Sequence, residues 1–150
     1  MATTFTNLLY HIVFSTKERR PMITEPIRSE LYPYLGGIVR EKDGILLEIG
    51  GTVDHVHIFA KLKQHIAIAD ILRELKANSS KLLNERPDLG QWYGWQTGYG
   101  AFTVSASQVS RVRNYIRNQE EHHRKRSFQE EFVNLLDKHG IEYEERYLWD

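Results

Sequence analysis

The sequence predicts an α+β fold built on an antiparallel sheet, and two observations predict this class. Short runs rich in β-branched and aromatic residues are typical of strands, and longer segments with apolar residues every three or four positions are typical of helices. These segments follow one another as strand, helix, strand, strand, helix and strand, and further helices complete the chain.

The first part of the chain predicts a strand and then a helix. Residues 8–16, LLYHIVFST, are rich in β-branched and aromatic side chains, so we expect a strand there. Residues 24–44 begin with a threonine that can cap a helix and end with a glycine that can terminate it. Pro33 and the Gly36–Gly37 pair disfavour helical backbone, and we expect them to break or bend this helix.

The middle of the chain predicts two strands joined by a tight turn. Residues 45–53, ILLEIGGTV, and residues 55–62, HVHIFAKL, both have the composition of strands. Only Asp54 separates them, so we expect a hairpin. The Gly50–Gly51 pair predicts a bulge or bend within it.

The second half of the chain predicts one strand among several helices. Residues 66–87 carry apolar residues at helical spacing, and residues 94–105 predict a strand interrupted by glycines. Residues 105–125 and 128–140 predict two more helices, of which the second is amphipathic and closed by a glycine. Residues 141–150 favour no particular element.

This order of elements is that of a ferredoxin-like sandwich with its split β-α-β arrangement. We therefore predict an antiparallel sheet with helices on one face plus extra C-terminal helices. The other face of the sheet is then left for a ligand, a partner subunit or those extra helices.

The composition predicts a single globular domain over residues 1–150. Hydrophobic residues make up 41% of the chain and charged residues 27%, which is enough for a sizeable core. No segment reaches the roughly 20 apolar residues of a membrane helix, and we expect no signal peptide. The absence of cysteine excludes disulfides and thiolate metal sites, and it is compatible with a reducing, cytoplasmic location. Because the formal net charge is zero, nucleic-acid binding would have to rest on a local basic patch.

Two histidines one residue apart begin the strand predicted over residues 55–62. Side chains alternate between the faces of a strand, so His55 and His57 point the same way within about 7 Å of each other. Neutral imidazole is a common metal ligand, and the pair could hold one ion from two sides. Two half-exposed histidines bonded to neighbours or water are the ordinary alternative, and the spacing alone does not decide between them.

A basic segment over residues 110–126 carries a tyrosine and a glutamine one helical turn apart. Tyr115 and Gln119 should lie on one face of the helix, and His122 and His123 follow on nearly the same face. Six arginine or lysine residues stand against two glutamates, which supplies the local patch that the overall charge conceals. A packed tyrosine on a solvated, basic helix is the ordinary alternative.

Four aromatic residues gather at the start of the strand predicted over residues 94–105. They are Trp92, Tyr93, Trp95 and Tyr99. Aromatic rings can stack on unpaired bases, but packing in a core or a dimer interface is their commoner use. We therefore expect packing here.

Taken together, the His-hydrophobe-His strand and the later Tyr-x-x-x-Gln helix resemble the HUH endonucleases. More closely, they resemble the single-tyrosine transposases of bacterial insertion sequences and their relatives, the REP-associated tyrosine transposases. The stretches HIVFSTKERRP, GGTVDHVHIFAKL and WQTGYGAFTVSASQVSRVRNYIRNQEEHH are similar to that family as well. The resemblance covers roughly residues 7–135.

The resemblance implies a ferredoxin-like, metal-dependent nuclease and strand transferase that acts on single-stranded DNA. Tyr115 would be the nucleophile, His55 and His57 would be metal ligands, and Gln119 would be the third ligand. The metal would be Mg²⁺ or Mn²⁺, because an amide oxygen is a hard ligand and cysteine is absent. The implied partners are DNA hairpins at the ends of the element and a second subunit in a homodimer, which in some relatives shares the site.

Several alternatives stay open at this point. His122 or His123 could replace the glutamine as third ligand, and Arg113, Arg117 and Lys61 are candidate phosphate contacts. The chain could also be a non-catalytic nucleic-acid-binding module on the same fold. A metal-dependent enzyme acting on small molecules is a third possibility, which the basic helix disfavours.

Overall fold

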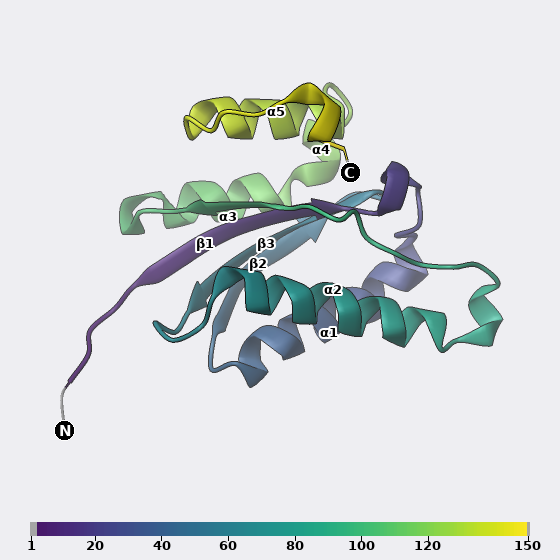
Figure 1. Ribbon diagram of the computed structural model, residues 1–150, viewed down its shortest axis with the longest axis horizontal. Coiled ribbons are helices and arrows are strands. Elements are labelled where there is room, and N and C mark those ends of the chain that lie inside the picture. The colour runs from purple at the N-terminus through teal and green to yellow at the C-terminus, as the bar shows by residue number, and fades with distance from the viewer. Residues whose placement is uncertain (1–2, 150) are drawn as a thin grey trace.

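The computed structural model describes residues 3–149, whose strands form one antiparallel sheet in the order β2-β3-β1-β4 (Figure 1). The strands are β1 (Leu8–Ser15), β2 (Ile45–Gly51), β3 (His55–Leu62) and β4 (Gly100–Thr103). The helices are α1 (Glu25–Glu41), α2 (Ile68–Asn84), α3 (Val109–Arg117), α4 (Gln119–His122) and α5 (Phe128–Lys138). Short 3-10 turns cover Lys17–Arg19, Pro87–Leu89, Ala106–Gln108 and Glu145–Tyr147. The predicted ferredoxin-like α+β fold is confirmed.

Helices cover both faces of the sheet (Figure 1). α1 and α2 lie against one face, and α3 and α5 lie over the other. The main core fills the first interface, and the predicted alternation along β3 is confirmed there, because Val56, Ile58, Ala60 and Leu62 all face this core. The histidines of β3 therefore face the second layer, which the C-terminal helices supply.

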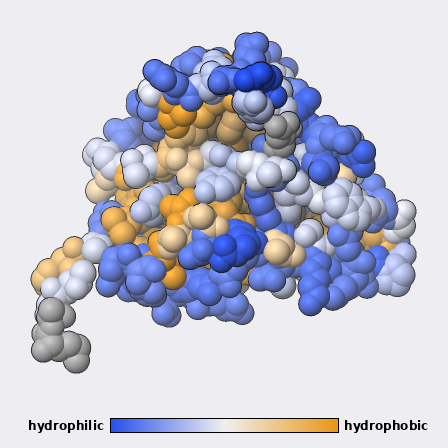
Figure 2. Space-filling model, viewed as in Figure 1, coloured by the Kyte–Doolittle hydropathy of each residue, from blue (hydrophilic) through white to orange (hydrophobic). Residues whose placement is uncertain are grey.

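Two smaller apolar clusters hold the second layer on the sheet. One joins α3 to the sheet through Leu9, Phe59 and Ile116. The other joins α5 to β1 and β4 through Val13, Phe102, Phe128, Phe132 and Leu136. Figure 2 shows apolar residues gathered beneath α5, while most of the remaining surface in this view is hydrophilic. Among residues 3–149, no helix combines the length and the hydrophobicity that a bilayer crossing requires.

α1 is continuous over Glu25–Glu41, so the helix does not break at Pro33 or at Gly36–Gly37. Pro33 is exposed, while the opposite side of the helix buries several leucine, isoleucine and valine side chains. Each such burial is worth about 1.5–3 kcal/mol, which together outweighs the roughly 3 kcal/mol cost of one helical proline. A Cβ atom at Gly36 would lie 2.9 Å from Leu46 Cδ2, so the glycine allows α1 to approach β2 closely.

β2 and β3 form the predicted hairpin, but the irregularity lies elsewhere. The register shifts between Leu46 and Glu48, and the bulge expected at Gly50–Gly51 is absent, since both glycines stay paired with β3. Close packing explains Gly50 instead. A Cβ atom there would lie 2.3 Å from the carbonyl oxygen of Ile116, so glycine lets α3 rest directly on β2.

β4 is shorter than the strand expected over residues 94–105. It covers only Gly100–Thr103. Residues 94–99 do not form a strand, and they contact the end of β1 by one isolated bridge between Trp95 and Thr16. β1 continues to Ser15, but the backbone N–H of Ser15 donates to the side chain of Gln96, and the regular ladder stops at the pair of Val13 and Gly100. This segment instead becomes a loop that packs against α2.

The helix expected over residues 105–125 is divided. A 3-10 turn precedes α3, and Asn118 separates α3 from α4 with φ −100° and ψ 27°. The chain turns at this residue, which lets α4 direct side chains toward the histidines of β3. The helix expected over residues 128–140 is confirmed as α5, and Gly140 ends it with a φ of 65°.

Candidate active site

The histidine pair of β3 lies at the centre of the molecule. His55 and His57 are both 0% exposed, so the alternative of two half-exposed, water-bonded histidines is wrong. β3 is an inner strand, flanked by β1 and β2, and α3 and α5 cover its histidine-bearing face. Buried imidazoles need polar partners, and the surrounding elements provide them.

A glutamate on α5 is the residue that the sequence analysis missed. Glu131 is 3% exposed, and its Oε1 lies 2.9 Å from His57 Nε2 and 3.4 Å from His55 Nε2. One ligand atom from each of these three residues lies within 4.8 Å of the others, which is a spacing suited to a metal ion. The sequence did contain a signal, because Glu131 interrupts the apolar face that Phe128 and Phe132 define on this helix.

The tyrosine helix completes the cluster from the other side. The Tyr115 hydroxyl donates a hydrogen bond to Glu131 Oε2, and its ring centroid lies 5.8 Å from that of His57. Gln119 Oε1 lies 3.0 Å from His55 Nε2. The expected partners, two imidazoles, a phenol and an amide, are therefore brought together within one chain.

The two histidines proposed as alternative ligands have different positions. His123 Nε2 lies 3.1 Å from the side-chain oxygens of both Gln119 and Glu131, so His123 belongs to the cluster. His122 instead packs against the Tyr115 ring, with centroids 4.8 Å apart. The structure thus brings His123 to the site beside Gln119, while His122 supports the tyrosine.

The second nitrogen of each β3 imidazole also has a fixed partner. His55 Nδ1 lies 2.8 Å from the carboxylate of Asp54, and His57 Nδ1 lies 2.7 Å from His11 Nε2 on β1. Such outer contacts fix the orientation of a ring and leave its Nε2 directed at a common point. His11 was not singled out from the sequence, although the alternation of β1 places it on the same face of the sheet as the pair.

The buried charges shift the protonation of these groups in opposite directions. Burial alone would lower the pKa of His55, but hydrogen bonds to Asp54 and Glu131 raise that pKa to about 9. Burial lowers the pKa of His57 and that of His11. Burial would raise the pKa of Glu131, but hydrogen bonds from the surrounding histidines hold it far below its usual range. The site is therefore built around a carboxylate and a charged His55.

The tyrosine is protonated in this arrangement. Burial raises the pKa of Tyr115 well above its usual value near 10, and the negative charge of Glu131 raises it further. The phenol keeps its proton on the hydrogen bond to that carboxylate. Its activation requires additional positive charge close to the hydroxyl.

Two surface hollows meet at Tyr115. The larger one, about 780 Å³, is lined by Arg111, Arg126 and Lys138, and the smaller one, about 390 Å³, is lined by Lys125 and again by Arg126. Basic side chains therefore border the approach to the phenol, together with the carboxylates of Glu121 and Asp137.

The predicted phosphate contacts lie away from this approach. Arg113 Nε and Arg117 Nη2 lie 3.6 Å and 2.8 Å from Glu48 Oε2, on the side of α3 that faces β2. Lys61 is near the far end of β3 from the histidine pair and borders a different hollow. The structure does not bring these three residues to Tyr115, and their DNA-binding role stays a prediction.

Comparison with known proteins assigns the family. The model of the IS200-like transposase family matches residues 4–119, and the chain belongs to that family. The resemblance drawn from the sequence is therefore confirmed at the level of a DNA transposase family. Glu131 lies beyond the matched residues.

Individual relatives agree with this assignment. The chain is 29% identical over 124 residues to the transposase of insertion sequence element IS200 from Salmonella typhimurium, covering 79% of this chain and 81% of the relative. It is 26% identical over 117 residues to the ISDra2 transposase TnpA of Deinococcus radiodurans, covering 75% and 84%.

Two solved structures share the fold. A candidate transposase from Deinococcus radiodurans R1 is 25% identical, with a TM-score of 0.63 over 79% of this chain and 95% of that one. A REP-associated tyrosine transposase bound to a REP hairpin is 13% identical, with a TM-score of 0.63 over 82% and 72%.

Proposed function

We propose that this transposase cleaves and rejoins single-stranded DNA at specific sites through a covalent bond between Tyr115 and a 5′ phosphate. The observation that carries the proposal is the convergence of a phenol, two imidazoles and an amide oxygen in one buried cluster, described above. A nucleophile next to a cation site is the arrangement that phosphoryl transfer through a side chain requires. Basic side chains around the phenol support DNA as the substrate.

The residues present fit a divalent cation. Nε2 of His55, Nε2 of His57, Oε1 of Gln119 and Oε1 of Glu131 approach one another within hydrogen-bonding distances, and His123 borders them. Imidazole nitrogens suit Zn²⁺ and Mn²⁺, and the amide and carboxylate oxygens suit Mg²⁺ and Mn²⁺; we propose Mg²⁺ or Mn²⁺, as the family resemblance implies. When bound, such a cation would act as a Lewis acid on the scissile phosphate, and its positive charge would lower the pKa of the nearby phenol.

The chemical step follows from the position of the tyrosine. The Tyr115 oxygen attacks the phosphorus and the bond from phosphorus to O3′ breaks, which leaves a 5′-phosphotyrosine and a 3′-hydroxyl. The phenol proton leaves to solvent as the new bond forms, while Glu131 orients the hydroxyl through its hydrogen bond, and the departing O3′ takes a proton from solvent. The phosphotyrosine keeps the energy of the ester, so a second 3′-hydroxyl can reverse the step and join a new strand.

The proposed DNA partner is a strand that carries a hairpin. The similar REP-associated tyrosine transposase is bound to a REP hairpin, and we extend that kind of partner to this chain. Arg111, Arg126 and Lys138 offer cationic contacts along the approach to Tyr115. We propose that the tyrosine and the cation ligands of one site come from the same chain, within the homodimer that the family resemblance implies; the hydrogen bond from Tyr115 to Glu131 supports this arrangement.

The experiment that tests the proposal is an adduct assay. Single-stranded DNA that carries the element's terminal hairpin is incubated with the protein and Mn²⁺, and the products are separated on a denaturing gel. We expect a covalent protein–DNA band for the unaltered protein and for Tyr34→Phe, an exposed tyrosine of α1 that serves as control. Tyr115→Phe should bind the DNA and give no band. A band from Tyr115→Phe would refute the assignment, and DNA binding without any band from the unaltered protein would support the non-catalytic alternative.

A further inference from the structure

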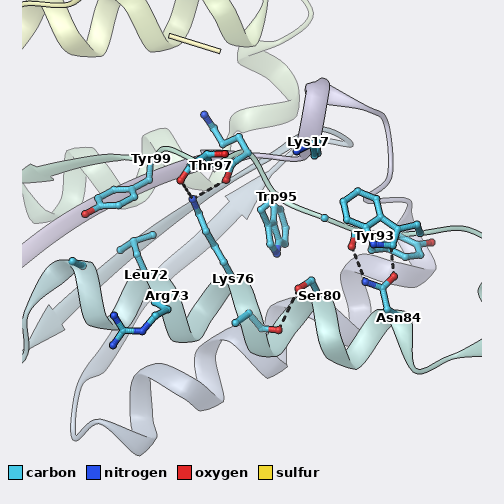
Figure 3. Close-up of a pocket in the computed structure, with 15 residues that line it drawn as sticks. Lys17, Leu72, Arg73, Lys76, Ser80, Asn84, Tyr93, Trp95, Thr97 and Tyr99 are labelled. Atoms are coloured by element: carbon cyan, nitrogen blue, oxygen red, sulfur yellow. Dashed lines mark hydrogen bonds between the residues drawn. The ribbon is translucent and has the colours of Figure 1, made fainter. Parts of the chain in front are cut away.

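A separate hollow lies beside α2, on the face of the sheet opposite the proposed catalytic cluster (Figure 3). It encloses about 620 Å³ between α2 and the loop of residues 92–99, and Lys17 borders it beyond the end of β1. We refer to this hollow as the α2 groove. Nothing in the proposed chemistry at Tyr115 uses it.

The aromatic residues of the loop divide into two kinds. Tyr93 is buried, and Trp95 packs edge-on against Phe14 and donates a hydrogen bond to Ser79 Oγ, so the expected packing is confirmed for these two. Trp92 and Tyr99 also line the groove, but they remain 56% and 38% exposed. A large exposed indole leaves apolar surface in water without gaining a core contact.

The exposed indole is nevertheless held in place. A Cβ atom at Gly94 would lie 2.0 Å from the Trp92 ring, so the ring rests directly on the backbone of Gly94. Lys76 fixes the same loop from α2, because its Nζ donates to the carbonyl oxygens of Gln96, Thr97 and Gly98 at 3.0, 3.2 and 2.6 Å (Figure 3). One face of the ring thus packs on the loop backbone, and the loop itself is hydrogen-bonded to α2.

The charged side chains that line the α2 groove are all positive. Lys17, Arg73 and Lys76 line it, and none of its lining residues among residues 3–149 is acidic. Arg73 contacts Asp70 on the outer side of α2 at 3.0 Å, but a guanidinium has five donors and can contact a second anion. In a chain of zero net charge, this is a local concentration of positive charge beside an exposed aromatic ring.

We propose that the α2 groove binds an unpaired stretch of the DNA strand, with a base stacked on Trp92 and the adjoining phosphates contacted by Lys17 and Arg73. A held aromatic face next to cations is the combination that binds single strands without base-specific hydrogen bonds. β1 links the two sites, because Ser15 pairs with His55 in the sheet and Lys17 follows two residues later. The choice of DNA as the ligand rests on the function proposed above.

The test measures binding separately from cleavage. All variants are made in the Tyr115→Phe protein, and the probe is a fluorescein-labelled strand of about 12 thymidines, within the usual range of single-strand site sizes. We expect Trp92→Ala to raise the Kd about 5- to 160-fold by fluorescence anisotropy, the range that loss of one stacked base produces. Tyr147→Ala, which removes an equally exposed ring outside the groove, should leave the Kd within about twofold.

A surface variant guards against misfolding of Trp92→Ala. Arg73→Ala should reduce the slope of log K against log salt by about 0.7, as expected for one lost phosphate contact on a single strand. Lys81→Ala, an exposed cation on the same helix outside the groove, should leave that slope unchanged. Equal Kd values for Trp92→Ala and Tyr147→Ala would overturn the proposal, as would equal slopes for Arg73→Ala and Lys81→Ala.

The outcome is distinguishable from failure of the proposed function. In protein that retains Tyr115, Trp92→Ala should still form the covalent adduct when the strand is saturating, because the groove does not touch the reacting atoms. If no protein forms the adduct but the binding effects above are observed, the proposed cleavage through Tyr115 is refuted and DNA binding by the α2 groove is supported.

Discussion

Glu131→Gln removes one negative charge from the centre of the proposed site and hardly changes the volume of the side chain. The carboxylate is 3% exposed and accepts hydrogen bonds from His57 at 2.9 Å, from His123 at 3.1 Å and from the Tyr115 hydroxyl. A glutamine keeps one acceptor oxygen and places an NH₂ group among donors. At least one of these hydrogen bonds is therefore lost, and His55 loses one of the two carboxylates that balance its charge, while Asp54 remains.

The expected cost follows from these contacts. Removing one partner of a buried ion pair costs about 3–5 kcal/mol in the free energy of unfolding, and we expect about 3 kcal/mol because the glutamine retains one acceptor. For a chain of this length, that corresponds to a fall in Tm of roughly 6–12 °C.

The loss of unfolding free energy caused by Glu131→Gln should depend on pH in a direction that the two pKa shifts define. The folded pKa of Glu131 is depressed, so its contribution is present above the unfolded value of about 4.3 and is lost as the pH falls through the folded pKa. The folded pKa of His55 is raised to about 9, so its contribution is present below the unfolded value of about 6.5 and is lost as the pH rises through 9. The difference between the two proteins should be largest between about pH 4.3 and 6.5 and should shrink as the pH rises toward 9.

Calorimetry of the metal-free proteins measures this difference. Glu130→Gln is the matched control, because Glu130 is the neighbouring residue of α5 and is exposed, and its effect should stay within about 0.5 kcal/mol. If Glu131→Gln melts at the same temperature as Glu130→Gln across this pH range, the carboxylate does not hold the histidine cluster together.

Three further predictions concern the metal, the packing of α3 and the subunits. Mn²⁺ binding at pH 7 should release protons, because His55 has a pKa of about 9 in the metal-free protein and must be neutral to act as a ligand; calorimetric heats that do not vary with buffer ionisation would contradict this. Gly50→Ala should destabilise the protein and reduce adduct formation, because a Cβ atom there would lie 2.3 Å from a carbonyl oxygen of α3, whereas Gly37→Ala, with open space at its Cβ, should preserve both stability and activity. A mixture of His57→Ala and Tyr115→Phe should form no adduct, since the proposed site lies within one chain, and restored activity would indicate a site shared between subunits.

The sequence was sufficient for the sheet and the histidine strand because their signals are local. Alternating side chains set the two faces of β3, and the order of elements set the ferredoxin-like topology. The lengths of the elements were harder to predict. α1 continues through Pro33 because burial of its other face outweighs the cost of the proline. β4 is short because the side chain of Gln96 takes the next backbone N–H of its partner strand, that of Ser15.

The candidate site could be predicted only in part, because half of it comes from contacts distant in sequence. Tyr115 and Gln119 share a helical face, which their spacing reveals. Glu131 and His11 reach the histidine pair from α5 and β1, and the spacing of residues carries no information on that approach. A charged residue within the apolar face of α5 was the one sequence signal that could have identified Glu131.

The most direct test of the account is a distance measurement between the phenol and the cation site. Fluorotyrosine placed at Tyr115 gives a ¹⁹F resonance, and paramagnetic Mn²⁺ broadens nuclei close to it. The account predicts strong broadening on addition of Mn²⁺ and its loss in His57→Ala. A resonance that keeps its width at saturating Mn²⁺ would contradict the claim that the tyrosine and the imidazole pair serve a single site.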